Sequence, residues 1–336
     1  MNQSYEKIMA LTKDVEKMLK DYILMQPDIL AASVNINELN NIPQGDVPGE
    51  RVEIKEKQVM KTGLLFQETA KALIPLLSKN TYKRAVITIC GGSGVGKTGI
   101  ASIFAHYFKC AGVGCYILSG DNYPHRIPKY NDAERLWVFR EGGIQGMVED
   151  GVYTEENFDI INKWQKEDED ANPAHLNDAV WFASYLNGGR KALEAYLGTE
   201  KEIAFNEVGS IVSAFKDGAK DIWLRRMGRE ETELWYEKVD FRDTNILLIE
   251  WTHGNSDYYK GVDFPILLNS TPRETLAYRK SRNRDGQTDS AFTTLVLEIE
   301  QEMLHRQAKK AKLILSKSGQ LLSYDEYCKI MEEGGM

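Results

Sequence analysis

The chain is poor in cysteine, in long apolar runs and in excess positive charge. Its 336 residues include four cysteines, too few for a disulfide framework in a chain this long, and no two of them form a Cys-x-x-Cys pair. No uninterrupted apolar stretch approaches the ~18 residues needed to span a bilayer. Met1 to Lys20 carries acids and lysines throughout and lacks the apolar stretch of a signal peptide. We therefore expect a reduced, cytoplasmic protein with no membrane partner.

The charge balance argues against general nucleic-acid binding. Lys and Arg number 42 against 50 Asp and Glu, which gives a formal net charge of −8, whereas a nonspecific binder of the phosphate backbone is normally basic over one face. We expect no nucleic-acid partner. The histidines and cysteines show no zinc spacing, and no nucleophile elbow is visible. The apolar share of 42% and the charged share of 27% are those of an ordinary globular protein.

Apolar spacing predicts a helical N-terminal region. Apolar residues from Tyr5 to Tyr22 recur every three or four positions, and a second such pattern runs from about Lys57 to Lys79. We interpret residues 1–80 as a helical extension and residues 81–336 as the main domain. No chemistry can be assigned to the extension from its residues.

A strand–loop–helix–strand pattern follows the extension. Ala85–Cys90 is a short β-branched run, an apolar helical pattern follows from Ile100 to Phe108, and Cys115–Leu118 is a second buried-strand candidate. Such a unit predicts a parallel sheet. We therefore expect an α/β fold with helices on both faces of a mostly parallel sheet. Three later runs are further strand candidates: Asn245–Glu250, Phe264–Leu268 and Leu313–Leu315.

The middle of the chain is richer in charge, Trp and Tyr. Helical patterns run over Leu176–Tyr196 and Glu202–Lys216, and Asp221–Asp240 alternates bulky and charged residues, which predicts a hairpin. The acidic run Glu167–Asp170 is predicted to be a solvated loop. A long charged helical stretch covers about Pro272–Ala311.

The strongest motif lies between the first strand and the helix that follows it. It matches the P-loop pattern G-x-x-x-x-G-K-[ST] without deviation, over Gly91, Gly92, Ser93, Gly94, Val95, Gly96, Lys97 and Thr98. The glycines let backbone N–H groups approach phosphate oxygens, and the helix N-terminus faces the same oxygens. Lys97 would reach the β- and γ-phosphates, and the Thr98 hydroxyl would be a Mg²⁺ ligand. We expect ATP and Mg²⁺ as cofactors.

A second group of polar residues ends the neighbouring strand. Ser119–Arg126 reads SGDNYPHR at the sheet edge where α/β proteins bind ligands. Asp121 could accept a hydroxyl proton, and His125 and Arg126 could hold a phosphate or another acidic group. The plainer alternative is that Asp121 caps a turn and both basic residues lie in solvent.

Together these motifs resemble the phosphoribulokinase/uridine kinase family of P-loop kinases. SGDNYPHR is similar to the family's G-D-S-F-H-R run, with one inserted proline. Leu247–Gly254 (LLIEWTHG) is similar to the family's strand that ends in E-G-L-H-G. Arg282–Asp285 (RNRD) is similar to the family's arginine-rich lid. The resemblance covers about residues 84–315. It implies a kinase domain over 81–336 with a substrate-covering insertion at about 141–240 and a lid at about 279–290.

The resemblance also implies roles for single residues. Asp121 matches the catalytic base and Glu250 the acid that helps hold Mg²⁺. Arg282 and Arg284 match lid arginines that close over the ATP phosphates, with Asp285 beside them. The acceptor would be contacted by Asp121, Tyr123, His125, Arg126, Arg229 and His253. The family's glycine after the strand acid is Trp251 here, which should reshape the pocket.

Further basic residues are weaker candidates. Arg225, Arg226 and Arg229 could bind an anionic acceptor from the predicted hairpin, whereas Glu207 is more simply structural. His253 could instead cap a turn. Arg279, with the other lid arginines, could lie on an ordinary solvated helix face.

The sequence thus predicts an ATP-dependent kinase that transfers the γ-phosphoryl group to a hydroxyl of a small, anionic or polyhydroxylated metabolite: a sugar, sugar phosphate, polyol or nucleoside. Two alternatives stay open, an adenylylsulfate kinase-like enzyme and a nucleotide-dependent switch that binds a protein partner. The absence of an N-K-x-D motif counts against GTP. A homo-oligomer is compatible with the family resemblance. The acceptor, the pathway and any allosteric effector do not follow from the residues.

Overall fold

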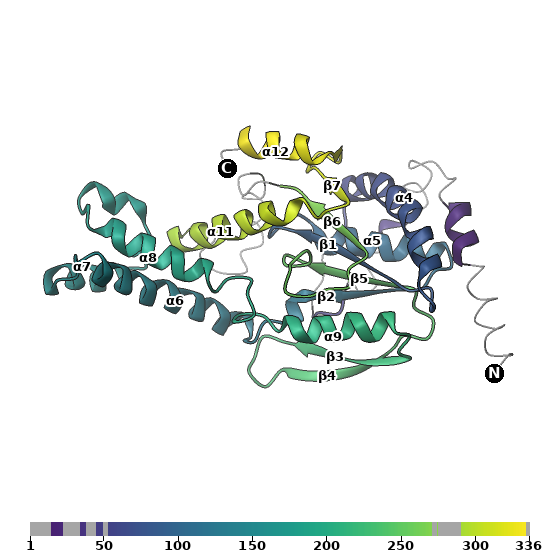
Figure 1. The fold of residues 1–336 in the computed structure, drawn as a ribbon, viewed down its shortest axis with the longest axis horizontal. Helices are drawn as coiled ribbons and strands as arrows, with labels where there is room; N and C mark the ends of the chain where they lie inside the picture. The colour runs from purple at the N-terminus through teal and green to yellow at the C-terminus, as the bar shows by residue number, and fades with distance from the viewer. Residues whose placement is uncertain are drawn as a thin grey trace. The chain divides into compact units, whose positions relative to one another are not determined.

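The apolar runs that the sequence marks as strands form one sheet. A computed structural model describes residues 15–22, 34–37, 45–49, 53–270, 274 and 290–333. The strands of the central sheet (Figure 1) are β1 (Ala85–Gly91), β2 (Cys115–Ser119), β5 (Ile246–Trp251), β6 (Phe264–Leu268), β7 (Leu313–Leu315) and β8 (Leu321–Leu322). β1 and β5 are buried along their whole length, as expected for strands that are covered on both faces.

The strand order creates a ligand-binding edge. The order is β2-β5-β1-β6-β7-β8, and every pair is parallel except β7 with β8. From β1 the chain goes to β2 on one side and later to β6 on the other. The carboxyl end of β1 is therefore a topological switch point, the place where open α/β sheets bind ligands. The predicted mostly parallel α/β fold is confirmed.

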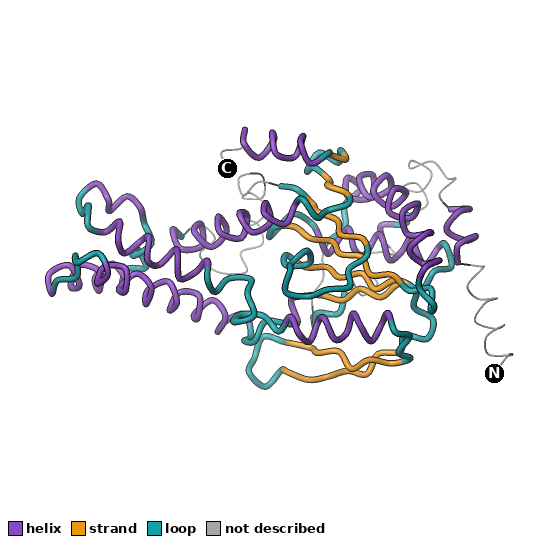
Figure 2. The backbone as a smooth tube through the Cα atoms, viewed as in Figure 1, coloured by secondary structure: helices purple, strands orange, loops and turns teal. Residues whose placement is uncertain are grey.

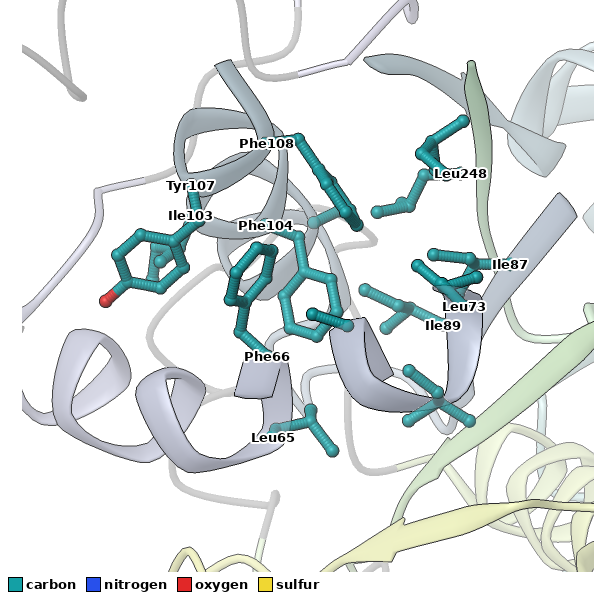
Figure 3. Close-up of a cluster of buried hydrophobic side chains, with 14 of the residues drawn as sticks. Leu65, Phe66, Leu73, Ile87, Ile89, Ile103, Phe104, Tyr107, Phe108 and Leu248 are labelled. Atoms are coloured by element: carbon teal, nitrogen blue, oxygen red, sulfur yellow. The ribbon is translucent and has the colours of Figure 1, made fainter. Parts of the chain in front are cut away.

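Helices cover both faces of this sheet. On one face, α4 (Glu56–Lys79) and α5 (Lys97–Cys110) pack against alternate residues of the central strands. Phe66 of α4 lies 4.9 Å, centroid to centroid, from Phe108 of α5, and Figure 3 shows this ring among Phe104 and Phe108. On the other face, Cys90, Leu267 and Ile314 pack with α12 (Tyr324–Glu333) and the last residues of α11 (Ala291–Ala308).

Both predicted N-terminal helices are present where the structure describes them, whereas the extension over 1–80 remains a prediction. Residues 15–22 are helical, and Val15 and Leu19 join the core beneath α4 and α5. The second predicted helix, Lys57–Lys79, corresponds to α4. The remainder of the first predicted helix, and residues 271–273 and 275–289 of the long charged stretch, lie outside the described residues.

The predicted hairpin forms a sheet of its own. β3 (Asp221–Met227) and β4 (Leu234–Asp240) pair antiparallel (Figure 2), directly after α9 (Phe205–Lys216). Arg84, just before β1, is buried and donates hydrogen bonds to the carbonyls of three residues around this hairpin: Phe215, Ala219 and Phe241. One guanidinium thus joins the end of α9 and both ends of the hairpin to the start of the central strand.

The described chain packs as two units. The first holds the described residues of Met1–Tyr123, Phe205–Thr271 and Leu304–Met336, and the second those of Pro124–Ala204 and Pro272–Met303. The second unit is helical, with α6 (Pro128–Glu149), α7 (Glu155–Lys166), α8 (Phe182–Glu194) and most of α11. The predicted insertion at about 141–240 and lid at about 279–290 remain predictions. In the described ranges, no helix combines the length and apolarity required to cross a bilayer.

Glycines set the approach of α6 and α8 inside the second unit. A Cβ added to Gly188 would lie 2.3 Å from the carbonyl oxygen of Gly142 and 2.9 Å from the Cα of Gly146. Glycine is therefore required at Gly188 by the closeness of the two backbones, because even a methyl group would overlap the facing helix.

The solvated loop predicted for the acidic run is wrong for its last residue. Asp170 is buried in the second unit. Its carboxylate accepts hydrogen bonds from Nε of Arg140 at 2.9 Å, from Nη2 of Arg140 at 2.8 Å and from the hydroxyl of Tyr185 at 2.8 Å. These donors come from other helices, and a bidentate guanidinium pair of this kind lets a carboxylate be buried.

Candidate active site

The P-loop connects the carboxyl end of β1 to the first turn of α5. Gly94 has a φ of +75° and Gly96 a φ of +99°, a left-handed backbone that L side chains rarely adopt. Gly96 is the N-cap of α5, and the Nζ of Lys97 lies 3.2 Å from the carbonyl oxygen of Gly92. The loop therefore curls back over its own start, the shape that directs amide groups and a lysine toward a bound phosphate.

Glu250 ends β5 beside this loop. Its side chain is 4% exposed and accepts hydrogen bonds from the hydroxyls of Thr98 at 3.2 Å and Ser119 at 3.4 Å. The strand register explains the meeting, because Glu250 pairs with Ile89 of β1 on one side and with Ser119 of β2 on the other. A carboxylate beside a P-loop hydroxyl is a hard oxygen set of the kind that Mg²⁺ prefers when phosphates complete its coordination.

The described residues offer few candidate donors for a metal ion. Within the part of the chain that the structure describes, no group of three or more His, Cys, Asp and Glu side chains could hold an ion. Mg²⁺ at kinase sites is usually held by one or two carboxylates plus substrate phosphates and water. Thr98 and Glu250 fit this use.

Asp121 lies on a turn at the end of β2. Gly120–Asn122 forms a single 3-10 turn, and the Ser119 hydroxyl accepts a hydrogen bond from the Asp121 amide at 3.4 Å. The Asp121 side chain is exposed. Since β2, β5 and β1 are adjacent and parallel, Asp121 lies at the same sheet edge as Glu250 and the P-loop.

Trp251 packs against the Gly120 backbone of this turn. Its indole is 2% exposed, and a Cβ added to Gly120 would lie 1.9 Å from it. The indole also lies 5.2 Å from the ring of Phe205 and 5.4 Å from that of His253. The indole thus fills the space next to Gly120, and His253 is buried beside it. That Trp251 reshapes the acceptor pocket stays a prediction.

Tyr123 and the hairpin arginines lie next to the Asp121 turn. Tyr123 is fully buried, burial raises the pKa of its hydroxyl, and this hydroxyl has no hydrogen-bond partner among the described residues. Nη1 of Arg225 lies 3.8 Å from the carboxylate of Glu207. Nη1 of Arg226 lies 3.0 Å from that of Asp46. Both guanidinium groups therefore face a carboxylate.

The remaining predicted site residues belong to the second unit, to the hairpin turn or to ranges outside the described residues. His125 and Arg126 belong to the second unit, where Nε2 of His125 lies 2.9 Å from the Glu200 carbonyl and Arg126 pairs with Glu134 at 3.1 Å. Arg229 is exposed on the β3–β4 turn. Arg279, Arg282, Arg284 and Asp285 lie outside the described residues.

Sequence reasoning missed two residues of this region. Asp46 stands in a segment of prolines and glycines to which no chemistry was assigned, and its partners are 70 or more positions away. Glu207 was interpreted as structural, and only the fold brings it to Arg225. One general signal points to such residues: buried arginines such as Arg225 and Arg226 require carboxylate partners. The sequence does not say which acidic residues these partners are.

Comparison with known proteins gives one curated relative and several solved structures. No protein-family model matches the chain. The chain is 39% identical over 262 residues, 78% of its length, to the bifunctional alpha-galactosidase/sucrose kinase AgaSK of Mediterraneibacter gnavus. The match spans only 23% of that relative.

Two solved structures are similar at low identity. One, assigned as a fructose transport system kinase from Silicibacter sp. TM1040, has a TM-score of 0.43 and 13% identity, covering 74% of this chain and 94% of that one. The other, assigned as a uridine kinase from Bacillus stearothermophilus, has a TM-score of 0.33 and 15% identity over 74% and 98% of the two chains. At these scores the superpositions say nothing about the substrate. The resemblance to the phosphoribulokinase/uridine kinase family therefore rests on the motifs of the chain and not on these superpositions.

Proposed function

We propose that the chain is an ATP-dependent kinase that phosphorylates a hydroxyl of a neutral sugar. The observation that supports the proposal is that three features lie at one edge of the sheet. They are the P-loop after β1, the Glu250 carboxylate that accepts a hydrogen bond from Thr98, and Asp121 on the turn after β2. The similarity to a protein named in part as a sucrose kinase supports a sugar as the acceptor. Sucrose is therefore the first compound to test.

The residues take the roles that phosphoryl transfer needs. The P-loop amides and Lys97 would bind the β- and γ-phosphates, and Thr98 and Glu250 would hold Mg²⁺, which neutralises phosphate charge when bound. Asp121 would orient the acceptor hydroxyl and take its proton, a contribution of roughly 10²- to 10⁴-fold to the rate. Arg282, Arg284 and Asp285 stay proposed lid residues.

The hairpin charges favour an uncharged acceptor over an anionic one. Arg226 is 5% exposed on its side chain and lies between the carboxylates of Asp46 and Glu237, each 3.0 Å away. Arg225 faces Glu207. A phosphorylated acceptor would need positive charge that is not already balanced, whereas sugar hydroxyls can bond to balanced Arg–Glu pairs as donors and acceptors.

The other predicted acceptor contacts remain part of this proposal. Tyr123, His125, Arg126, Arg229 and His253 carry hydroxyl, imidazole and guanidinium groups that could hydrogen-bond a sugar. Of these, Tyr123 and His253 are buried beside the Asp121 turn, so their side chains would have to rearrange to reach an acceptor.

The test is Mg·ATP consumption with a panel of acceptors. The panel holds sucrose, other neutral disaccharides and monosaccharides, their phosphate esters, polyols, nucleosides and adenylylsulfate. Asp121→Asn is measured beside Asp217→Asn, an exposed aspartate near the end of α9 that bonds to Ser213. We expect stimulation by a neutral sugar that Asp121→Asn abolishes and Asp217→Asn leaves unchanged, with ATP binding intact in both variants.

Three results would contradict the proposal. Stimulation only by phosphate esters or by adenylylsulfate would overturn the neutral acceptor. Near-normal turnover of Asp121→Asn would remove Asp121 as the base. ATP binding with no stimulation by any compound would favour the switch interpretation, and a nucleotide-dependent protein partner would then be sought.

A further inference from the structure

A buried aspartate from the N-terminal region contacts the segment that carries Asp121. The side chain of Asp46 is 6% exposed. Its Oδ1 accepts hydrogen bonds from the Ser119 amide at 2.8 Å and from Nδ2 of Asn122 at 3.0 Å. Its Oδ2 accepts from the Tyr116 hydroxyl at 3.2 Å and from Nη1 of Arg226 at 3.0 Å. One carboxylate therefore joins β2, the turn after it and β3.

The contact with Ser119 gives a backbone amide of an edge strand the hydrogen-bond acceptor that the sheet does not provide. β2 is the first strand in the order of the described sheet and pairs only with β5, so its outward amides have no strand partner. A buried amide without an acceptor costs about 1–3 kcal/mol. Asp46 supplies the missing acceptor two positions before Asp121.

The far side of the same turn is fixed by the hairpin. The Asn122 side-chain oxygen accepts a hydrogen bond from the Met227 amide at 3.1 Å, while its Nδ2 donates to Asp46. Asp121 therefore lies between two residues, Ser119 and Asn122, that both bond to the one carboxylate. The Trp251 indole fills the space next to Gly120. The turn is therefore held by three contacts: with Asp46, with the backbone of the hairpin and with Trp251.

We propose that Asp46 is a positioning residue for phosphoryl transfer, holding the Ser119–Asn122 turn so that Asp121 is aimed at the acceptor hydroxyl. The inference rests on the proposed function and assigns a task to the N-terminal region. In this role Asp46 acts through the turn, without contacting the reacting atoms itself. Because misplacement of a reacting group by 1 Å can cost about 100-fold in rate, loosening this turn should slow turnover more than it weakens binding.

The experiment compares three variants of the full chain. Asp46→Asn removes the charge and keeps the side-chain shape. Asp46→Asn combined with Arg226→Gln also removes the guanidinium, so that a folding failure caused by an unpaired buried cation is separated from loss of positioning. Asp263→Asn is the matched control, because Asp263 is 19% exposed on its side chain, pairs with Lys216 at 2.6 Å and accepts from the Val86 amide at 2.9 Å, at the amino end of β1.

The first readout does not depend on catalysis. Hydrogen exchange of the peptide covering residues 115–123 should be faster by about tenfold or more in both Asp46 variants, since a hydrogen bond to a charged group is worth about 1.5–3 kcal/mol. It should be unchanged in Asp263→Asn. Unchanged exchange in the Asp46 variants would overturn the inference whatever the protein catalyses.

The second readout uses the acceptor found in the panel. Both Asp46 variants should lower kcat by about 10- to 100-fold. In Asp46→Asn, which keeps Arg226, KM for ATP and for the acceptor should stay within about threefold of wild type, as for an interaction needed mainly in the transition state. Normal kcat with faster exchange would refute the positioning role while leaving the kinase proposal intact. Equal losses in Asp263→Asn would show a general structural effect and would also refute it.

Discussion

Asp46 should make the stability of the protein depend on pH in a direction opposite to that of most carboxylates. Burial raises its pKa from 3.8 to about 6, and Arg226, the Ser119 amide and the Tyr116 hydroxyl only partly oppose this. Because the folded state prefers the protonated carboxyl, the folded chain binds more protons than the unfolded chain between these two values. The contribution of Asp46 to stability is therefore fully present below about pH 4 and is lost as the pH rises through about 6.

The magnitude follows from the size of the shift. A difference of about 2 pKa units at about 1.36 kcal/mol per unit gives roughly 3 kcal/mol. We expect the unfolding free energy of wild type minus that of Asp46→Asn to fall by this amount between about pH 4 and pH 7, since asparagine does not titrate and other groups cancel in the difference.

The assay is urea unfolding of both chains at half-unit pH intervals. Of the groups bonded to Asp46, Arg226 and Tyr116 keep their protonation state across this range, because both have pKa values raised from already high ordinary values. Glu237, the other carboxylate on Arg226, is tested with Glu237→Gln as the control. A difference that stays flat with pH, or that rises with pH, would refute the reasoning.

Three further predictions concern the rest of the fold. Arg84→Ala should cost about 3–5 kcal/mol of unfolding free energy, because three carbonyl groups lose a charged donor. Its KM for ATP should stay normal because Arg84 precedes the amino end of β1, and an altered KM would contradict this. Gly188→Ala should lower the unfolding free energy by about 1–3 kcal/mol, seen as a lower thermal midpoint, because the added methyl group overpacks α6 against α8. Gly209→Ala in α9 should be neutral or stabilising, because a Cβ there meets only an ordinary contact at 3.6 Å. Equal effects of the two substitutions would count against the packing argument. Lys97→Ala should lower kcat by at least about 10²-fold with an unchanged circular dichroism spectrum, and an unchanged kcat would refute the phosphate-binding role.

Local patterns predicted the sheet well, because each central strand is buried on both faces. A continuous, mostly apolar run suits such a position, so Ala85–Cys90 and Phe264–Leu268 could be recognised without tertiary information. The β3–β4 hairpin followed from alternation in the same way. The helix predicted from Glu202 begins at Phe205 instead, since Glu202 is buried and bonded to Arg135 and the Gly198 amide.

The candidate site was predictable where all the residues needed for one role are consecutive in the sequence. The P-loop is contiguous, so its role could be proposed from eight residues. Asp46 and Asp170 were not predictable, because burial of a carboxylate depends on donors that are distant in sequence. The partners of Arg225 and Arg226 were missed for the same reason, which led to the expectation that these arginines could bind an anionic acceptor.

The strand order has a consequence for how the protein is made. β5 lies between β2 and β1, so these two early strands cannot pair with each other and must wait for a strand that follows about 130 residues later. At ribosomal rates this delay is roughly 6 to 25 s. During that time two apolar strands on the nascent chain have open edges, while the helices from Pro128 to Glu194 are already complete. We therefore expect that exposed strand edges make the nascent chain prone to aggregation, and that aggregation during expression begins at these early strands.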